Sequence, residues 1–180
     1  MSKKATEYHQ KGLDHASRKD YGKAIIAYTK AIEMNPEEAE FYSDRAVAFF
    51  HVDQAHYSLE DMNRAQQLEP RKGYRYSSRA FIKDHLGDLD GAIADYQIAV
   101  EIDPEDAIAQ NNLGLLEEKK GYVQESKKRF VTADQLAEKE KEQIKNGETP
   151  DRWKENGKEN AEGKDEEGGA ERQKIPVEDG

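Results

Sequence analysis

Residues 73–106 read GYRYSSRAFIKDHLGDLDGAIADYQIAVEIDPED, and this stretch of 34 residues has a counterpart on each side of it. Units that begin at Ala5, Ala39, Gly73 and Ala107 place similar residue types at the same positions. The eighth residue is small in every unit: Gly12, Ala46, Ala80 and Gly114. The twenty-fourth is large and the twenty-seventh is always alanine: Tyr28, Met62, Tyr96 and Phe130, then Ala31, Ala65, Ala99 and Ala133. A register kept over four units predicts a stacked-repeat architecture.

The spacing within a unit predicts two helices. Tyr8 and Gly12 are one helical turn apart, and Ala24, Tyr28 and Ala31 define one face of a second helix. Turn-prone residues such as Leu86-Gly87-Asp88 separate the halves, and Pro36, Pro70 and Pro104 end the second halves. Each unit is therefore predicted to be a helical hairpin. Because one hairpin cannot cover its own apolar face, stability is expected to come from stacking neighbours.

These small, aromatic and proline positions resemble the tetratricopeptide repeat (TPR) family from residue 5 to about residue 138. The resemblance implies an all-α, right-handed superhelical solenoid of four helix-turn-helix repeats with an extended C-terminal capping helix. Gln110 departs from the family pattern, which has a large apolar residue at that position. Glu138 replaces the closing proline, so we expect the final helix to run on through Ala133 to Asn146.

The predicted domain organisation has three parts. Residues 1–4 are flexible, and residues 5–146 form the repeat domain with units 5–38, 39–72, 73–106 and 107–146. Residues 147–180 hold eleven acids against six bases and few apolar residues, so we expect a disordered acidic tail. Within it, 149–151 could start a short helix that returns Trp153 to the last repeat, and 174–177 could form an extended recognition segment.

Composition narrows the function classes. The net charge is −10, with 37% charged residues and 35% hydrophobic residues, which suits a thin, elongated core and argues against nucleic-acid binding. The absence of cysteine excludes disulfides, thiolate nucleophiles and thiolate metal sites. No apolar run is long enough for a signal peptide or a membrane span. We therefore expect a soluble, cytoplasmic protein that makes no membrane contact.

Candidate binding residues lie on the face of each first helix that points away from its hairpin partner. An apolar strip and a polar ladder are predicted there: Leu13, Val47, Phe81 and Leu115 with Tyr74 and Ile108, then Gln10, Asp44, Ser78 and Asn112. If the first helices line the inner curve, as the resemblance implies, these residues form a groove for an extended or helical peptide of a partner protein. The alternative is that the strip only packs between adjacent first helices.

The sequence predicts a non-enzymatic protein-interaction module, an adaptor or scaffold, with no catalytic residues, no cofactor and no metal. One alternative is a structural module that dimerises through repeat stacking. Another is a co-chaperone-like module that lacks the usual carboxylate clamp, because His9, Leu13, Asp44, Tyr74 and Ser78 stand at the clamp positions. His51 and His85 occupy equivalent positions and could form a weak metal or pH-sensing pair, although solvated surface histidines fit better.

Overall fold

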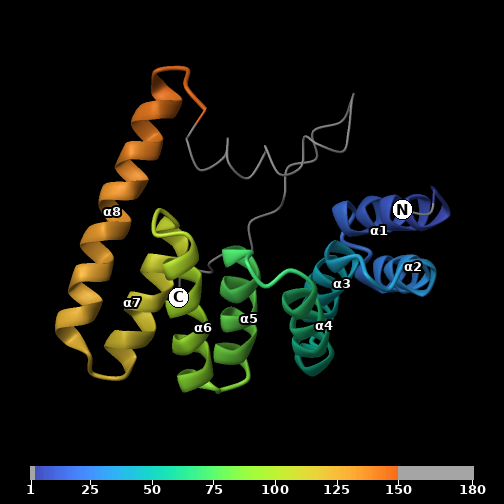
Figure 1. Cartoon of the computed structure of the whole chain (residues 1–180), viewed down its shortest axis with the longest axis horizontal. Helices are drawn as coiled ribbons and strands as arrows, with labels where there is room; N and C mark the ends of the chain where they lie inside the picture. Colours follow the sequence, from blue (N-terminus) through green and yellow to red (C-terminus); the bar gives the residue numbers. More distant parts are fainter. Residues whose placement is uncertain (1–2, 150–180) are drawn as a thin grey trace. The chain divides into compact units, whose positions relative to one another are not determined.

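The computed structural model describes residues 3–149, which form eight α-helices and no strand within that range (Figure 1). Their bounds are α1 Lys3–Ser17, α2 Tyr21–Met34, α3 Ala39–His51, α4 Ala55–Leu68, α5 Gly73–His85, α6 Leu89–Ile102, α7 Ala107–Lys119 and α8 Val123–Lys145. The chain divides into one compact unit, Met1–Lys139, and a second, Glu140–Gly180. The ten predicted groove residues all lie in the first unit. Trp153 and residues 174–177, singled out from the sequence, lie outside the described residues.

Neighbouring helices in the chain are neighbours in space. The pairs α1·α2, α3·α4 and α5·α6 form the hairpins, while α2·α3, α4·α5 and α6·α7 join each hairpin to the next. Side chains of α7 and α8 complete the fourth pair, since Arg129 of α8 donates to Gln110 of α7 at 3.1 Å. The prediction of an all-α superhelical solenoid with an extended final helix is confirmed, and α8 has 23 residues. No helix among the described residues is long and apolar enough to cross a membrane.

The turn inside every hairpin uses the same backbone conformation. The fifteenth residue of each unit has a positive φ: Lys19 60°, Asp53 59°, Gly87 83° and Gly121 86°. The following N–H then donates to the carbonyl five residues earlier, as from Asp20 to His15 at 2.9 Å and from Asp88 to Lys83 at 2.9 Å. This bond satisfies a carbonyl at the end of the first helix. The third and fourth units have glycine at this position, which adopts a positive φ without steric cost, whereas the first and second have Lys19 and Asp53.

The link between repeats is fixed by a side chain on the next first helix. The second helices end at Met34, Leu68 and Ile102, two residues before each proline. The fourth residue of the following unit donates to that proline's carbonyl: Tyr42 to Pro36 at 3.1 Å, Tyr76 to Pro70 at 3.2 Å and Gln110 to Pro104 at 3.1 Å. Gln110, which departs from the family pattern, therefore keeps the same hydrogen bond through a different chemical group.

The small residues at the eighth position let the two helices of a hairpin approach closely. Ala46 and Ala80 are fully buried. At Gly12 an added Cβ would lie 2.3 Å from a ring carbon of Tyr28, and at Gly114 it would lie 2.8 Å from Phe130. The large residue of the second helix thus fills the space beside the small residue of the first.

Candidate functional site

All ten predicted groove residues lie on first helices. They divide among α1 (Gln10, Leu13), α3 (Asp44, Val47), α5 (Tyr74, Ser78, Phe81) and α7 (Ile108, Asn112, Leu115). None of them is buried. The apolar residues are half-buried on α1, α3 and α5 but open on α7, where Ile108 is 42% and Leu115 46% exposed. We call this surface, the shared face of α1, α3, α5 and α7, the first-helix face.

Aromatic contacts join α3 to α5 across the first-helix face. The ring of Phe81 lies 5.2 Å from that of Phe50, and His85 meets Phe50 edge-on at 4.9 Å. Phe81 thus uses part of its surface to pack between adjacent first helices, as one of the two interpretations of the strip expects. It remains half-buried, so these contacts do not enclose Phe81 completely.

Three of the four polar-ladder residues already bond within the chain. His9 Nε2 and Asp44 Oδ2 are 2.6 Å apart and link α1 to α3. Asn112 donates to the hydroxyl of Tyr96 at 3.1 Å. Gln10 donates to Asp14 at 3.2 Å on the same helix. These bonds hold the three side chains in defined orientations.

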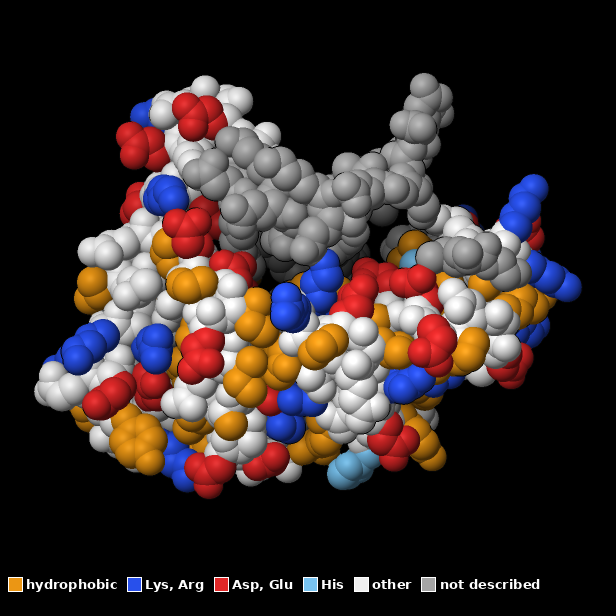
Figure 2. All heavy atoms as spheres, in the orientation of Figure 1, with side chains coloured by type: hydrophobic (Ala, Val, Ile, Leu, Met, Phe, Trp, Pro, Cys, Tyr) orange, Lys and Arg blue, Asp and Glu red, His pale blue; other side chains and the backbone are white. Residues whose placement is uncertain are grey.

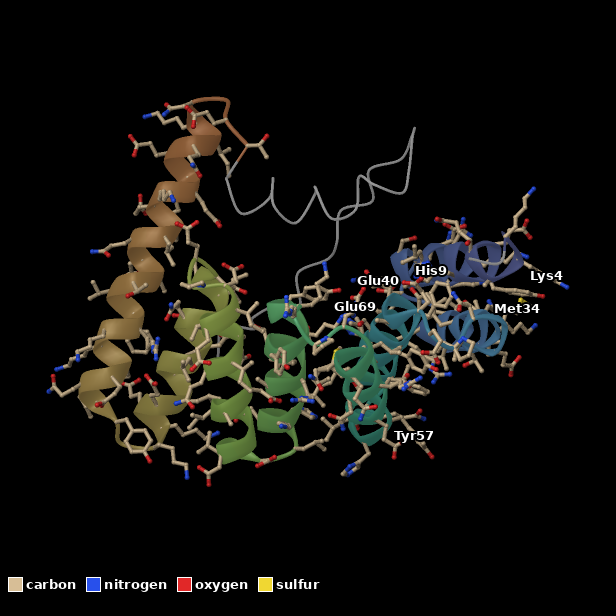
Figure 3. All side chains as sticks on the ribbon, viewed as in Figure 1. Lys4, His9, Met34, Glu40, Tyr57 and Glu69 are labelled. Atoms are coloured by element: carbon tan, nitrogen blue, oxygen red, sulfur yellow. The ribbon has the colours of Figure 1, made fainter. Side chains whose placement is uncertain are left out.

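A charged cluster lies where α3, α5 and the loop between α4 and α5 meet. Arg75, 1% exposed, donates to Glu69, to Glu40 at 3.3 Å and to the hydroxyl of Ser43. The hydroxyl of Tyr74 donates to Glu40 at 3.1 Å, and the Arg75 guanidinium sits 4.9 Å from the centre of the Tyr74 ring. Burial, and then the negative charge of Glu40, raise the pKa of Tyr74. Figure 3 labels Glu40 and Glu69 in this region, and Figure 2 shows acidic side chains gathered there.

Two arginines that sequence reasoning did not single out connect adjacent repeats. Arg45 binds Asp61 through two nitrogens, at 2.7 and 2.8 Å, and reaches back to Thr29 of the previous repeat at 3.0 Å. Arg79 repeats the pattern, with Asp95 at 2.7 Å twice and Asn63 at 3.1 Å. Such two-point pairs fix geometry as well as charge. The signal was present in the sequence, because both pairs recur at the 34-residue spacing.

The predicted histidine pair takes two different environments. His51 stacks on Tyr21 with ring centres 4.2 Å apart, whereas His85 lies against Phe50. Burial, followed by the charge of Lys19, lowers the pKa of His51. Within residues 3–149, no group of three or more His, Asp or Glu side chains is placed to hold a metal ion.

Comparison with known families agrees with this architecture. Residues 85–121 match the model described as TPR repeat, and residues 9–52 match the model described as tetratricopeptide repeat. The chain is a tetratricopeptide repeat protein. The two matched segments cover parts of all four hairpins. They include helix α3, which carries Arg45, and helix α7, which carries Ile108 and Leu115.

Similar proteins share the repeat region. The chain is 39% identical over 66 residues to small glutamine-rich tetratricopeptide repeat-containing protein 2 of Mycosarcoma maydis, and 37% identical over 67 residues to serine/threonine-protein phosphatase 5 of Homo sapiens. Each match covers 37% of this chain, but only 19% and 13% of those relatives. The chain therefore spans less than a fifth of the length of the curated relatives it matches.

Solved structures match over a larger share. The crystal structure of MamA has a TM-score of 0.73 at 25% identity, and the match covers 77% of this chain and 81% of the MamA chain. The first TPR of Spaghetti (RPAP3), solved with the HSP90 peptide SRMEEVD, has a TM-score of 0.65 at 27% identity. The match covers 67% of this chain and 96% of the RPAP3 chain. The chain is thus a repeat-built protein-interaction module.

Proposed function

We propose that this TPR protein is a non-enzymatic adaptor or scaffold that binds a peptide or helical segment of a partner protein on its first-helix face, in the cytoplasm. The observation that carries the proposal is the pair of exposed apolar side chains on α7, Ile108 and Leu115, in line with the partly open ring of Phe81. Ile108 and Leu115 lie two turns apart on one side of α7, and apolar side chains gathered on one exposed face favour a recognition surface.

In this mechanism the apolar strip receives side chains of the partner. The exposed parts of Leu13, Val47 and Phe81 extend the contact from α7 toward α1, with Tyr74 and Ile108 widening it. The polar ladder, Gln10, Asp44, Ser78 and Asn112, orients the partner's backbone by hydrogen bonds. Burial supplies most of the affinity and the ladder sets the register, as in other peptide-recognition surfaces.

Recognition of a terminal carboxylate does not suit this face. The RPAP3 repeat domain was solved with a peptide whose last four residues, EEVD, include three acidic side chains. The positions of a carboxylate clamp here include Asp44 and Tyr74. Asp44 is paired with His9, and Tyr74 already donates its hydroxyl to Glu40. A ligand carboxylate placed between them would meet two carboxylates of the protein. We therefore favour a ligand that does not place a terminal carboxylate here over the co-chaperone-like alternative.

The test compares two exposed apolar residues on different helices, Leu115 on α7 and Ile26 on α2. Leu115→Glu adds a charge to the first-helix face, and Ile26→Glu adds the same charge on α2, where Ile26 is 61% exposed. In affinity capture from lysate followed by mass spectrometry, Leu115→Glu is expected to lose the partners of the wild type while Ile26→Glu keeps them. Far-ultraviolet dichroism checks that both variants stay helical.

Two results would contradict the proposal. Partners that persist with folded Leu115→Glu would move the binding surface elsewhere. A mass in light scattering that doubles with concentration, and that Leu115→Glu leaves unchanged, would favour the alternative of a homodimer formed by repeat stacking.

A further inference from the structure

We propose that the first-helix face binds its partner as an amphipathic helix, which lies along α7 at the junction between α5 and α7 and places two apolar side chains, seven residues apart, over Ile108 and Leu115. This inference rests on the proposed function and adds the position and the conformation of the ligand to it. It follows from a difference between this junction and the one between α3 and α5.

The junction between α3 and α5 is filled by side chains of both helices. Phe50 of α3 packs against Phe81 of α5 with ring centres 5.2 Å apart, and it also meets His85. Arg75 of α5 donates to the hydroxyl of Ser43 on α3. An apolar side chain and a hydroxyl of this junction therefore both find partners within the chain.

The junction between α5 and α7 has different residues at the equivalent positions. Asp84 stands where the preceding repeat has Phe50, and its carboxylate pairs with Lys119 of α7 at 3.2 Å. Leu115 is the counterpart of Phe81, one repeat further along. An aspartate directed to a lysine cannot cover Leu115 as Phe50 covers Phe81, and Leu115 is 46% exposed.

The same junction leaves a hydroxyl without a partner. Ala109 of α7 is the counterpart of Arg75, and Ser77 of α5 is the counterpart of Ser43. Alanine has no side-chain donor, and within residues 3–149 the buried Oγ atom of Ser77 has no hydrogen-bond partner. Because buried hydroxyls are usually paired, this is a second and independent sign that α5 and α7 do not complete each other's contacts.

The spacing of the two open residues favours a helical ligand. Ile108 and Leu115 are seven residues apart on α7, which places them two turns and about 10.5 Å apart along its axis. A helix that lies beside α7 repeats this distance with side chains seven residues apart on one face. An extended segment along α7 has side chains on one face at separations of about 6.7 and about 13.4 Å, so it fits one of the two residues at a time.

Two occupants from the chain itself fit less well. Residues 147–180 contain three large apolar residues, Trp153, Ile175 and Val177, and no two of them are seven apart. A second copy would present its own α7, but each copy carries a net charge of −10, and repulsion between like charges opposes association. A helix of another protein has neither limitation, so the proposal commits to a partner protein.

The experiment uses the full chain and labelled peptides in fluorescence anisotropy. The probe is a neutral helical peptide of alanine and glutamine with two leucines seven residues apart. The control has the same composition with the leucines nine residues apart, which places them on opposite faces. Because the control buries one leucine at a time, we expect it to bind about ten-fold more weakly than the probe. Equal affinities overturn the inference, as does a probe that does not bind.

Two protein variants locate the peptide. Asp84→Phe gives α5 the ring that Phe50 provides in the preceding repeat, so it is expected to cover Leu115 and abolish binding of the probe. Asp90→Phe is the matched control, because it also breaks a pair with a lysine, Lys120, but lies on α6. It is expected to leave binding unchanged. Far-ultraviolet dichroism checks that both variants stay helical, and unchanged binding by folded Asp84→Phe overturns the inference.

The failure of this inference is distinguishable from failure of the proposed function. If the probe fails while Leu115→Glu still abolishes capture of partners from lysate, the inference falls and the proposed function stands. If Leu115→Glu also keeps its partners, both fall. A mass in light scattering that doubles with concentration, and that Leu115→Glu returns to the monomer, assigns the face to a second copy and overturns the inference.

Discussion

Gly12→Ala and Gly22→Ala form a matched pair that tests the close approach of helices within a hairpin. Both glycines are helical, at different depths. Gly12 lies against the ring of Tyr28, and an added Cβ would stand 2.3 and 2.4 Å from two ring carbons. Gly22 has nothing within 4 Å of its added Cβ. The same chemical change is therefore expected to have opposite effects on stability.

The magnitudes follow from burial. Tyr28 is 1% exposed and packs in the cluster with Ala24 and Ala48, so its ring cannot swing into water to make room. Forcing a methyl group into a packed core costs about 1–3 kcal/mol, and the contacts at Gly12 are well below normal separation, which points to the upper half of that range. Alanine returns up to about 1 kcal/mol in a helix interior. The net loss for Gly12→Ala is therefore about 1–2 kcal/mol, whereas Gly22→Ala gains a few tenths because it lies in the first turn.

Urea denaturation followed by far-ultraviolet dichroism measures both changes, and hydrogen exchange locates them. Because the first repeat contacts only its neighbour, loosening at Gly12 is expected to appear as lost protection in α1 and α2 before the remaining helices. If Gly12→Ala stabilises the protein as much as Gly22→Ala does, the two helices are not in close contact and the packing argument is refuted.

Three further predictions concern stability. Arg45→Met leaves Asp61 buried without its two-point partner and is expected to lower the free energy of unfolding by about 3 kcal/mol in chemical denaturation. The control, Arg64→Met, breaks a pair with the 72%-exposed Glu37 and is expected to lower it by at most about 1 kcal/mol. Equal losses would contradict the role assigned to Arg45. Lys19→Gly relieves a positive φ and is expected to raise stability by about 1 kcal/mol in thermal denaturation, and a loss there would show that the turn tolerates a side chain freely. Burial raises the pKa of Glu117 in the folded protein, against the opposing effect of Arg129. The protonated carboxyl therefore stabilises the fold at pH values below its ordinary pKa, and this stabilisation is lost as the pH rises through the pKa of the folded state. Glu117→Gln is therefore expected to gain stability relative to the wild type as pH rises from about 4 to 7, and parallel pH profiles would refute the assignment.

The repeat register was predictable because it depends on residue size. A small eighth residue opposite a large twenty-fourth residue, as in Gly12 and Tyr28, is visible in the sequence and dictates how two helices meet. The role of Gln110 was not predictable, because its bond to the Pro104 carbonyl depends on the path of the linker. Sequence reasoning read it as a departure from the pattern, although the hydrogen bond is the same one that Tyr42 and Tyr76 make.

The candidate site was predictable only in outline. Helical spacing assigns Phe81 and Leu115 to one face, and the structure places them on first helices with open surface. The rotation of adjacent repeats relative to one another determines which polar side chains form hydrogen bonds or ion pairs with the next repeat. Residue spacing within one helix carries no information about that rotation. The His9–Asp44 pair and the Arg75 cluster arise in this way, each from residues about one repeat apart. Whether the ten residues bind a ligand stays a prediction.

Photo-crosslinking tests the central claim most directly. A photo-reactive phenylalanine analogue is placed at Phe81, on the first-helix face, or at Tyr57, which is 57% exposed on α4. The account predicts that a captured partner crosslinks at position 81 and not at position 57. A partner that crosslinks at position 57 alone would contradict it.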